Sequence, residues 1–263
     1  KDGDPSTTTL TINLDSNPTT TNLTPQGSGG DVSVDEDDLL ASRGAGEAAG
    51  SDTSKESTTQ GGTFTITAGD GVDDLTIGGN AFITNGVFTA GSFTTALGNT
   101  LSVTAYNAGT GVVSYTYTLL DNEAHAAANG ENALFENFAV HLTDTDTGVA
   151  DSTLSVRIVD DVPTAEADVD KTTSGTANGN VILGTGMTGG VADIAGADGL
   201  ASPAVVGVST SAGSITDGTG VGGVVASAKG TLTLGADGAF TYTKTDAEAT
   251  GTDTFYYTII DKD

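Results

Sequence analysis

Acidic side chains in closely spaced pairs are the residues of this sequence with the clearest chemistry. The chain has 263 residues, with 35 Asp and Glu against 8 Lys and Arg, which gives a formal net charge of −27. Calcium takes about six to eight oxygen ligands, largely from carboxylates and backbone carbonyls. None of the clusters matches an EF-hand loop, so we expect any calcium ion to draw its ligands from several loops.

The acidic clusters lie where one folded unit is expected to meet the next, for example on both sides of Pro163. Loops at the ends of a β-sandwich can gather such clusters around a junction, where a divalent cation would cancel the repulsion between carboxylates. The alternative is a set of solvated acidic loops that keep the protein soluble. We predict calcium, and the candidate ligands are Asp2, Asp4, Asp35, Asp37, Asp38, Asp121, Glu123, Asp144, Asp146, Asp160, Asp161, Asp168, Asp170, Asp261 and Asp263.

Cysteine is absent from the sequence, and so is tryptophan. Small extracellular domains often depend on disulfides because their hydrophobic cores are small. A chain rich in carboxylates can use a hard cation for the same purpose. The missing disulfides therefore favour the calcium prediction.

Other chemistry finds little support in the sequence. The two histidines, His125 and His141, have no cysteine partners and no zinc-binding spacing, so we expect one loop histidine and one strand histidine. No Gly-x-Ser-x-Gly elbow occurs. The glycine-rich run at 218–223 lacks the lysine of a phosphate-binding loop. A glycosidase cleft is usually lined with aromatic residues, and the lack of Trp argues against one. We predict that the protein is not an enzyme.

The charge and the apolar pattern exclude two classes of partner. A field this negative repels nucleic acid and anionic lipid headgroups. The apolar runs are too short for a transmembrane helix. We therefore expect neither nucleic-acid binding nor membrane insertion.

Alternating polar and apolar residues predict an all-β protein. Turn residues such as those at 69–71 and 235–238 separate the short strands, which is typical of β-sandwiches. Only 131–138 favours a short helix, because Leu134 and Phe138 would share one face. The predicted strands cover 9–14, 62–67, 101–106, 113–119, 154–158, 232–234, 239–243 and 254–260.

Internal repetition predicts the domain organisation. Residues 114–123 align with 254–263, and 10–14 align with 154–158. We expect 1–14 to be the closing strand of a preceding or split domain, followed by a linker at 15–29. A first sandwich then covers 30–161, with a long loop at 41–61. A second sandwich covers 162–263 and lacks its last strand.

Five segments carry a resemblance to a known family: 34–39, 114–132, 142–146, 158–165 and 230–242. The first four resemble the tandem repeats of type I-secreted, RTX-type giant bacterial adhesins, and 230–242 resembles their related cadherin-like repeats. The resemblance covers nearly the whole chain and is most specific over 114–165. The sequence lacks the glycine-rich nonapeptides of the calcium β-roll found in such adhesins.

The resemblance implies tandem immunoglobulin-like, cadherin-like β-sandwich domains made rigid by calcium at their junctions. It further implies an extracellular location on a bacterial cell surface, with neighbouring repeats as partners. The function expected from it is an extender that projects a distal binding module in adhesion and biofilm formation. The alternative is a module that itself binds a peptide or glycan through the 41–61 loop or an insertion at 124–137.

Overall fold

The computed structural model describes residues 3, 5, 7–11, 16–41, 43, 48–52, 57–126, 130–215, 218–246 and 248–262. Within these ranges the protein is all-β, as predicted, and its helical elements are three short 3-10 turns: η1 (Gln26–Ser28), η2 (Glu36–Asp38) and η3 (Ala212–Ser214). None of the helical elements in this part of the chain is long and apolar enough to cross a membrane.

Two sheets of the first sandwich face each other across one core. The five-stranded sheet has the order β1 (Thr19–Thr21), β3 (Thr59–Thr67), β9 (Val112–Thr118), β8 (Thr100–Asn107) and β7 (Gly91–Thr94). The six-stranded sheet has the order β2 (Val32–Asp35), β11 (Val149–Val159), β10 (Ala133–Asp144), β4 (Val72–Ile77), β5 (Asn80–Thr84) and β6 (Val87–Phe88). The strand pairs are antiparallel except β2 and β11, which run parallel.

Side chains that alternate along these strands build the first core. In β9, alternate residues including Tyr115 and Tyr117 are buried, as the period-two pattern requires. Phe64 on β3 and Leu75 on β4 come from opposite sheets and are both fully buried. The core is therefore closed from both sides.

The second sandwich has a four-stranded and a two-stranded sheet. The four-stranded sheet has the order β12 (Thr176–Asn180), β16 (Ala239–Lys244), β15 (Gly230–Leu234) and β14 (Val224–Ala226). The two-stranded sheet pairs β13 (Leu200–Ser209) with β17 (Tyr256–Asp261). Its core is a separate and smaller cluster that includes Val205, Leu234 and Ile259.

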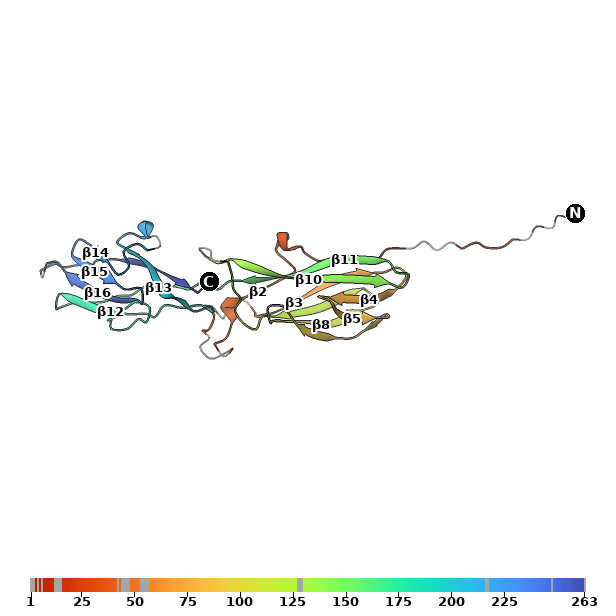
Figure 1. Cartoon of the computed structure of the whole chain (residues 1–263), viewed down its shortest axis with the longest axis horizontal. Coiled ribbons are helices and arrows are strands. Elements are labelled where there is room, and N and C mark those ends of the chain that lie inside the picture. The colour runs from red at the N-terminus through yellow and green to blue at the C-terminus, as the bar shows by residue number, and fades with distance from the viewer. Residues whose placement is uncertain are drawn as a thin grey trace.

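The two sandwiches follow each other along the long axis of the molecule (Figure 1). The strands β10 and β11 run along this axis, so one of their ends faces the second sandwich and the other faces away from it. The end of the chain after β17 lies beside the boundary between the sandwiches. Loops from both units therefore meet at this boundary.

The helix predicted near 131–138 is wrong, because these residues belong to β10 and its approach. β10 pairs with β11 from Ala133 to Thr143, and its burial alternates from Glu136 to Leu142. Leu134 and Phe138 are four residues apart, which places them on one face of a strand as well as of a helix. The spacing that suggested a helix therefore did not discriminate between the two.

The segment before the first sandwich differs in part from its prediction. Residues 15–29, predicted to be a linker, contain β1, which pairs with β3, and the turn η1. Residues 7–11 are exposed and form no strand in the structure. Residues 12–14 lie outside the described part of the chain, so the closing strand expected at 1–14 stays a prediction.

Candidate metal centres

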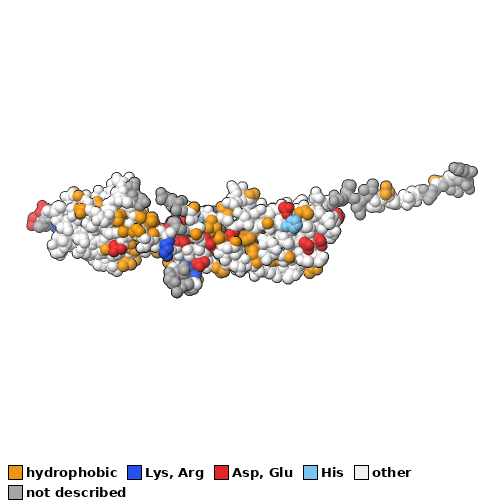
Figure 2. Space-filling view, in the orientation of Figure 1, with side chains coloured by type: hydrophobic (Ala, Val, Ile, Leu, Met, Phe, Trp, Pro, Cys, Tyr) orange, Lys and Arg blue, Asp and Glu red, His pale blue; other side chains and the backbone are white. Residues whose placement is uncertain are grey.

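A group of acidic residues lies at the boundary between the sandwiches, and Figure 2 shows acidic side chains on the surface beside this boundary. We call it the junction cluster. It contains predicted ligands from three separate segments together with Glu36 and Asp198, which the sequence prediction did not include. Its members are Asp35, Glu36, Asp37, Asp38, Glu123, Asp160, Asp161 and Asp198.

Strand pairing explains why these segments meet. Because β2 and β11 are parallel and Asp35 lies opposite Val159, the residues that follow both strands emerge at the same end of the sheet. Those residues are Glu36 and Asp160. The antiparallel strand β10 begins at this end, and the backbone N–H of Asp160 donates to the carbonyl of Asn132, 3.0 Å away.

The turn η2 directs acidic side chains inward. The carboxylate of Asp35 accepts a hydrogen bond from the backbone N–H of Asp37 at 3.2 Å and so caps the turn. Within the turn, Glu36 and Asp38 are buried. A run of acidic residues that would ordinarily be expected in solvent therefore supplies buried carboxylates.

Asp161 joins the two sandwiches directly. Its Oδ2 accepts from the backbone N–H of Ala197 at 2.7 Å and from that of Ser51 at 2.9 Å. Ala197 is 1% exposed and belongs to the core cluster of the first sandwich, although it lies in the second unit. Gly196 has φ of +74°, and a Cβ there would lie 2.9 Å from the Asp161 carbonyl oxygen, so this approach needs glycine.

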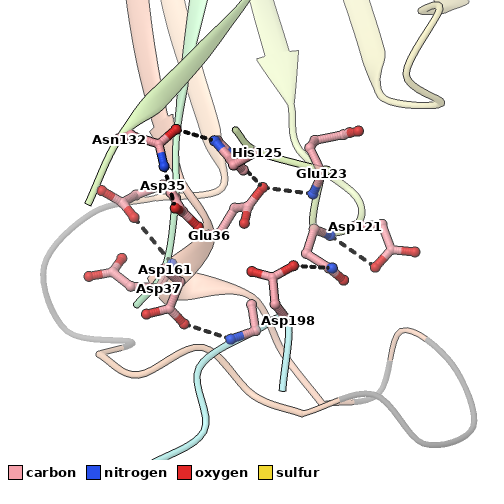
Figure 3. Close-up of polar contacts among 12 residues, drawn as sticks. Asp35, Glu36, Asp37, Asp121, Glu123, His125, Asn132, Asp161 and Asp198 are labelled. Carbon is pink, nitrogen blue, oxygen red and sulfur yellow. Dashed lines mark hydrogen bonds and ion pairs between the residues drawn. The ribbon is translucent and has the colours of Figure 1, made fainter. Parts of the chain in front are cut away.

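The neighbouring polar contacts also cross the boundary. The amide of Asn122 donates to Asp198 Oδ1 at 2.6 Å (Figure 3). The guanidinium of Arg43 donates to the carbonyl of Ala197 at 3.2 Å and forms an ion pair with Asp121 at 3.0 Å. Asp121, predicted as a metal ligand, is 59% exposed in this pair and already faces a cation.

Burial of the junction carboxylates has an electrostatic cost, because it disfavours their charged forms. Desolvation raises the pKa of Glu36 from 4.5 to about 7, against the stabilising hydrogen bonds from His125 and Glu123. Desolvation and the nearby Asp35, Asp38 and Asp161 raise the pKa of Asp37 from 3.8 to about 7. A bound cation would favour the charged form of both groups.

Two buried oxygens point to a missing positive partner. Glu36 Oε2 and Asp37 Oδ1 accept no hydrogen bond from any described residue. Buried carboxylate oxygens are normally satisfied by donors or cations. The junction cluster therefore has acceptor capacity left for a metal ion.

A second group, the distal cluster, lies at the opposite end of the first sandwich. It consists of Asp70, Asp144 and Asp146, whose ligand oxygens lie within 4.8 Å of one another. Asp144 is 1% exposed, its Oδ1 accepts from the Gly148 N–H at 2.6 Å, and its Oδ2 has no hydrogen-bond partner in the described chain. Asp70 was not among the predicted ligands.

The distal cluster lies far from the junction cluster. Asp144 ends β10, whereas Glu123 lies at the junction, where β10 begins. β10 has 12 residues, which at about 3.3 Å per residue separates its two ends by ~40 Å. The two clusters are therefore different sites.

Asp168 and Asp170 bind backbone groups of the second sandwich. Asp168 Oδ1 accepts from the Val191 N–H at 2.9 Å, and Asp170 Oδ1 accepts from the Thr188 N–H at 3.1 Å. Within the described ranges, neither belongs to a group of three potential ligands. Their expected role as metal ligands therefore stays a prediction.

The remaining predicted ligands lie in or near the chain ends. Asp261 is the last residue of β17 and lies opposite Leu200. Asp2, Asp4 and Asp263 fall outside the described residues. The prediction for these three residues therefore stays open.

The two histidines occupy different environments. His141 lies in β10, as expected of a strand histidine, and its Nδ1 is 2.6 Å from Asp151 Oδ1. His125 Nε2 lies 3.1 Å from Glu36 Oε1, and both side chains are almost completely buried. Glu36, His125 and Asp160 together offer three ligand atoms within 4.8 Å of one another. Sequence spacing contained no signal for this group, because 89 positions separate Glu36 and His125.

Comparison with known proteins adds no assignment. No protein-family model matches the chain, and no curated protein matches it significantly.

Proposed function

We propose that this chain is a calcium-stabilised extender segment of a secreted bacterial surface adhesin, built from immunoglobulin-like, cadherin-like domains. The observation that carries the proposal is Asp37 Oδ1, a buried carboxylate oxygen without a donor in the described chain, at the boundary between two sandwiches. Asp35, Asp38 and Asp161 surround Asp37 closely enough to raise its pKa. Such a group of oxygens suits a hard cation.

Calcium would act at the boundary by holding segments that otherwise repel one another. Among the described residues, the contacts across the boundary include the packing of Ala197 into the first core and hydrogen bonds such as those of Asp161 to Ala197 and of Asn122 to Asp198. A typical hydrogen bond adds only about 0.5–1.5 kcal/mol. An ion shared between η2 and the end of β11 would restrict hinge motion and keep the sandwiches in line.

The distal cluster supports the same function at the other end of the sandwich. It contains only oxygen ligands, and the β10–β4 register sets Asp144 opposite Val72, two residues after Asp70. An extender needs a stabilised connection at both ends. Neighbouring repeats on an extracellular bacterial surface are the partners that this proposal requires.

The rival function, a peptide- or glycan-binding module, has less support. Both segments that would provide its binding loops contribute to the junction instead. Ser51 Oγ from the 41–61 loop donates to Asp161 at 2.5 Å, and Asn132 Nδ2 from the insertion donates to Asp160 at 2.8 Å. Side chains that already form hydrogen bonds at the boundary are less able to bind a peptide or glycan.

Thermal unfolding with calcium, with magnesium and with a chelator tests the proposal. Calcium at about 100 times its dissociation constant adds about 2.7 kcal/mol of stability per independent site, whereas magnesium should add much less because it sheds water reluctantly. Small-angle scattering should report an extended shape with calcium and a wider spread of interdomain angles with chelator.

Amino-acid substitutions in each cluster show which cluster binds the stabilising calcium. Asp37→Asn with Asp38→Asn should remove the junction's share of the calcium stabilisation, and Asp144→Asn should remove the distal share. Glu248→Gln changes an exposed acidic residue of the second sandwich and is the matched control. A melting temperature that does not respond to chelation would contradict the proposal.

A further inference from the structure

One part of the junction differs from the rest because it contains a nitrogen ligand. His125 Nε2 lies 3.1 Å from Glu36 Oε1, and the side chains are 1% and 0% exposed. Asp160 completes the group, with its ligand oxygen within 4.8 Å of the other two ligand atoms. We call Glu36, His125 and Asp160 the nitrogen-containing triad.

Asn132 fixes which nitrogen of His125 carries hydrogen. The Asn132 amide nitrogen donates to Asp160 Oδ2 at 2.8 Å and to the Ala126 carbonyl at 3.2 Å. Its Oδ1 therefore faces His125 Nδ1, 3.3 Å away (Figure 3). A carbonyl oxygen can only accept, so Nδ1 must be the donor.

This assignment leaves Nε2 facing a carboxylate. In the neutral ring with Nδ1–H, Nε2 is an acceptor, and so is Glu36 Oε1. Two acceptors 3.1 Å apart require a positive charge between or beside them, either a shared proton or a metal ion. A hydrogen bond from the second ring nitrogen to an oxygen is the usual way in which a metal-binding histidine is oriented.

The distance between Glu36 and His125 fits a first-row divalent ion. Nitrogen and oxygen ligands about 2.0–2.2 Å from zinc lie about 2.8–3.6 Å apart at octahedral or tetrahedral angles, and the Glu36–His125 separation is 3.1 Å. Glu36 Oε2, which is completely buried and accepts no hydrogen bond from the described residues, adds acceptor capacity at the same place.

We propose that Glu36, His125 and Asp160 bind a divalent transition metal of the zinc class, with Asn132 as the positioning residue for the imidazole. Imidazole nitrogen suits zinc, nickel and copper, whereas calcium takes oxygen ligands. The chain has no cysteine, and of the two groups of three potential ligands among the described residues, this triad is the one that contains a nitrogen. The junction would then hold two kinds of ion, with calcium bound by its oxygen-only part.

Metal titration of the tag-free chain in excess calcium tests the proposal. Zinc measured by calorimetry, and cobalt measured by its visible absorption, should each bind one equivalent. His125→Ala should weaken zinc binding by about 100-fold or more, and Asn132→Ala by about 10- to 100-fold, the cost expected for losing a partner that orients a ligand. His141→Ala is the matched control, because His141 is the only other histidine and also faces a carboxylate.

A measurement on the unmodified chain guards against a variant that fails to fold. Nitrogen-15 NMR of the two imidazoles should show zinc shifting Nε2 of His125 while His141 stays unchanged. Three results would overturn the proposal: zinc binding that disappears in excess calcium, equal losses in both histidine variants, or a His125 signal that reports only a proton shared with Glu36. Calcium-dependent melting is measured separately, so failure of one proposal leaves the other distinguishable.

Discussion

The two sandwiches differ in the size of their sheets and even more in the size of their cores. Among the described residues, the core cluster of the first contains 21 buried residues and that of the second contains six. Because burial of apolar surface is the main favourable term in folding, the second sandwich has less intrinsic stability. It also contributes Ala197 to the first core, so part of its order depends on its neighbour.

This difference between the cores predicts which sandwich the junction stabilises more. A weakly packed unit gains most from a contact that restrains its loops, and the segment around Ala197 and Asp198 is held by Asp161, Arg43 and Asn122. Metal binding at the junction should therefore stabilise the second sandwich more than the first. Calorimetry in chelator should resolve two transitions, with the second sandwich unfolding first.

The largest effect should come from a cavity in the smaller core. Leu234→Ala removes a side chain that is 1% exposed in the second sandwich, and such a change costs about 2–5 kcal/mol. We expect the second sandwich of this variant to be unfolded already at room temperature, so that the lower transition is absent from the thermal scan. Leu75→Ala, a matched change in the first core, should lower only the upper transition. If both variants changed both transitions equally, the expectation that the two cores unfold independently would be wrong.

An intermediate effect should follow from uncoupling the sandwiches. Asp161→Asn removes the charge that accepts from Ser51 and Ala197, and a hydrogen bond to a charged group contributes about 1.5–3 kcal/mol. We expect the lower transition to shift down while the upper one moves little. Asp170→Asn, an acidic residue bonded within the second sandwich, is the control and should leave the coupling intact.

The smallest effect should be a gradual dependence on pH in chelator. The pKa of Glu36 rises from 4.5 to about 7 and that of Asp37 from 3.8 to about 7, chiefly through desolvation. Burial disfavours the imidazolium of His125, but Glu36 and Asp160 outweigh it and raise its pKa from 6.5 to about 9. The folded state therefore binds more protons than the unfolded chain between pH ~4 and ~9.

Stability without metal should accordingly be highest at pH ~4 and below as far as these groups are concerned, and should fall as the pH rises from ~4 toward ~9. Chemical denaturation across this range measures the slope. Saturating calcium should flatten the slope through Asp37, because the ion favours the ionised carboxylate. A slope of the opposite sign in chelator would show that the junction carboxylates are not desolvated.

Many of the strands could be predicted from the sequence alone. Alternation at 62–67, 101–106 and 113–119 predicted β3, β8 and β9, since side chains of a strand alternate between core and solvent and this periodicity is local. The same local reasoning failed at 131–138, where a spacing of four residues fits both a helix and a strand. Pairing with β11 decided for the strand.

The grouping of the acidic residues was decided by tertiary structure. The sequence by itself marked Asp35, Asp37, Asp160 and Asp161 as candidate ligands, since carboxylates in pairs are a compositional signal. It contained no sign that Glu36 would meet His125 or that Asp198 would cross the boundary. Those encounters depend on the parallel pairing of β2 with β11 and on a glycine-dependent turn at Gly196, which are long-range features of the fold. Residue type thus determined what these side chains can bind, and strand pairing decided which of them can bind together.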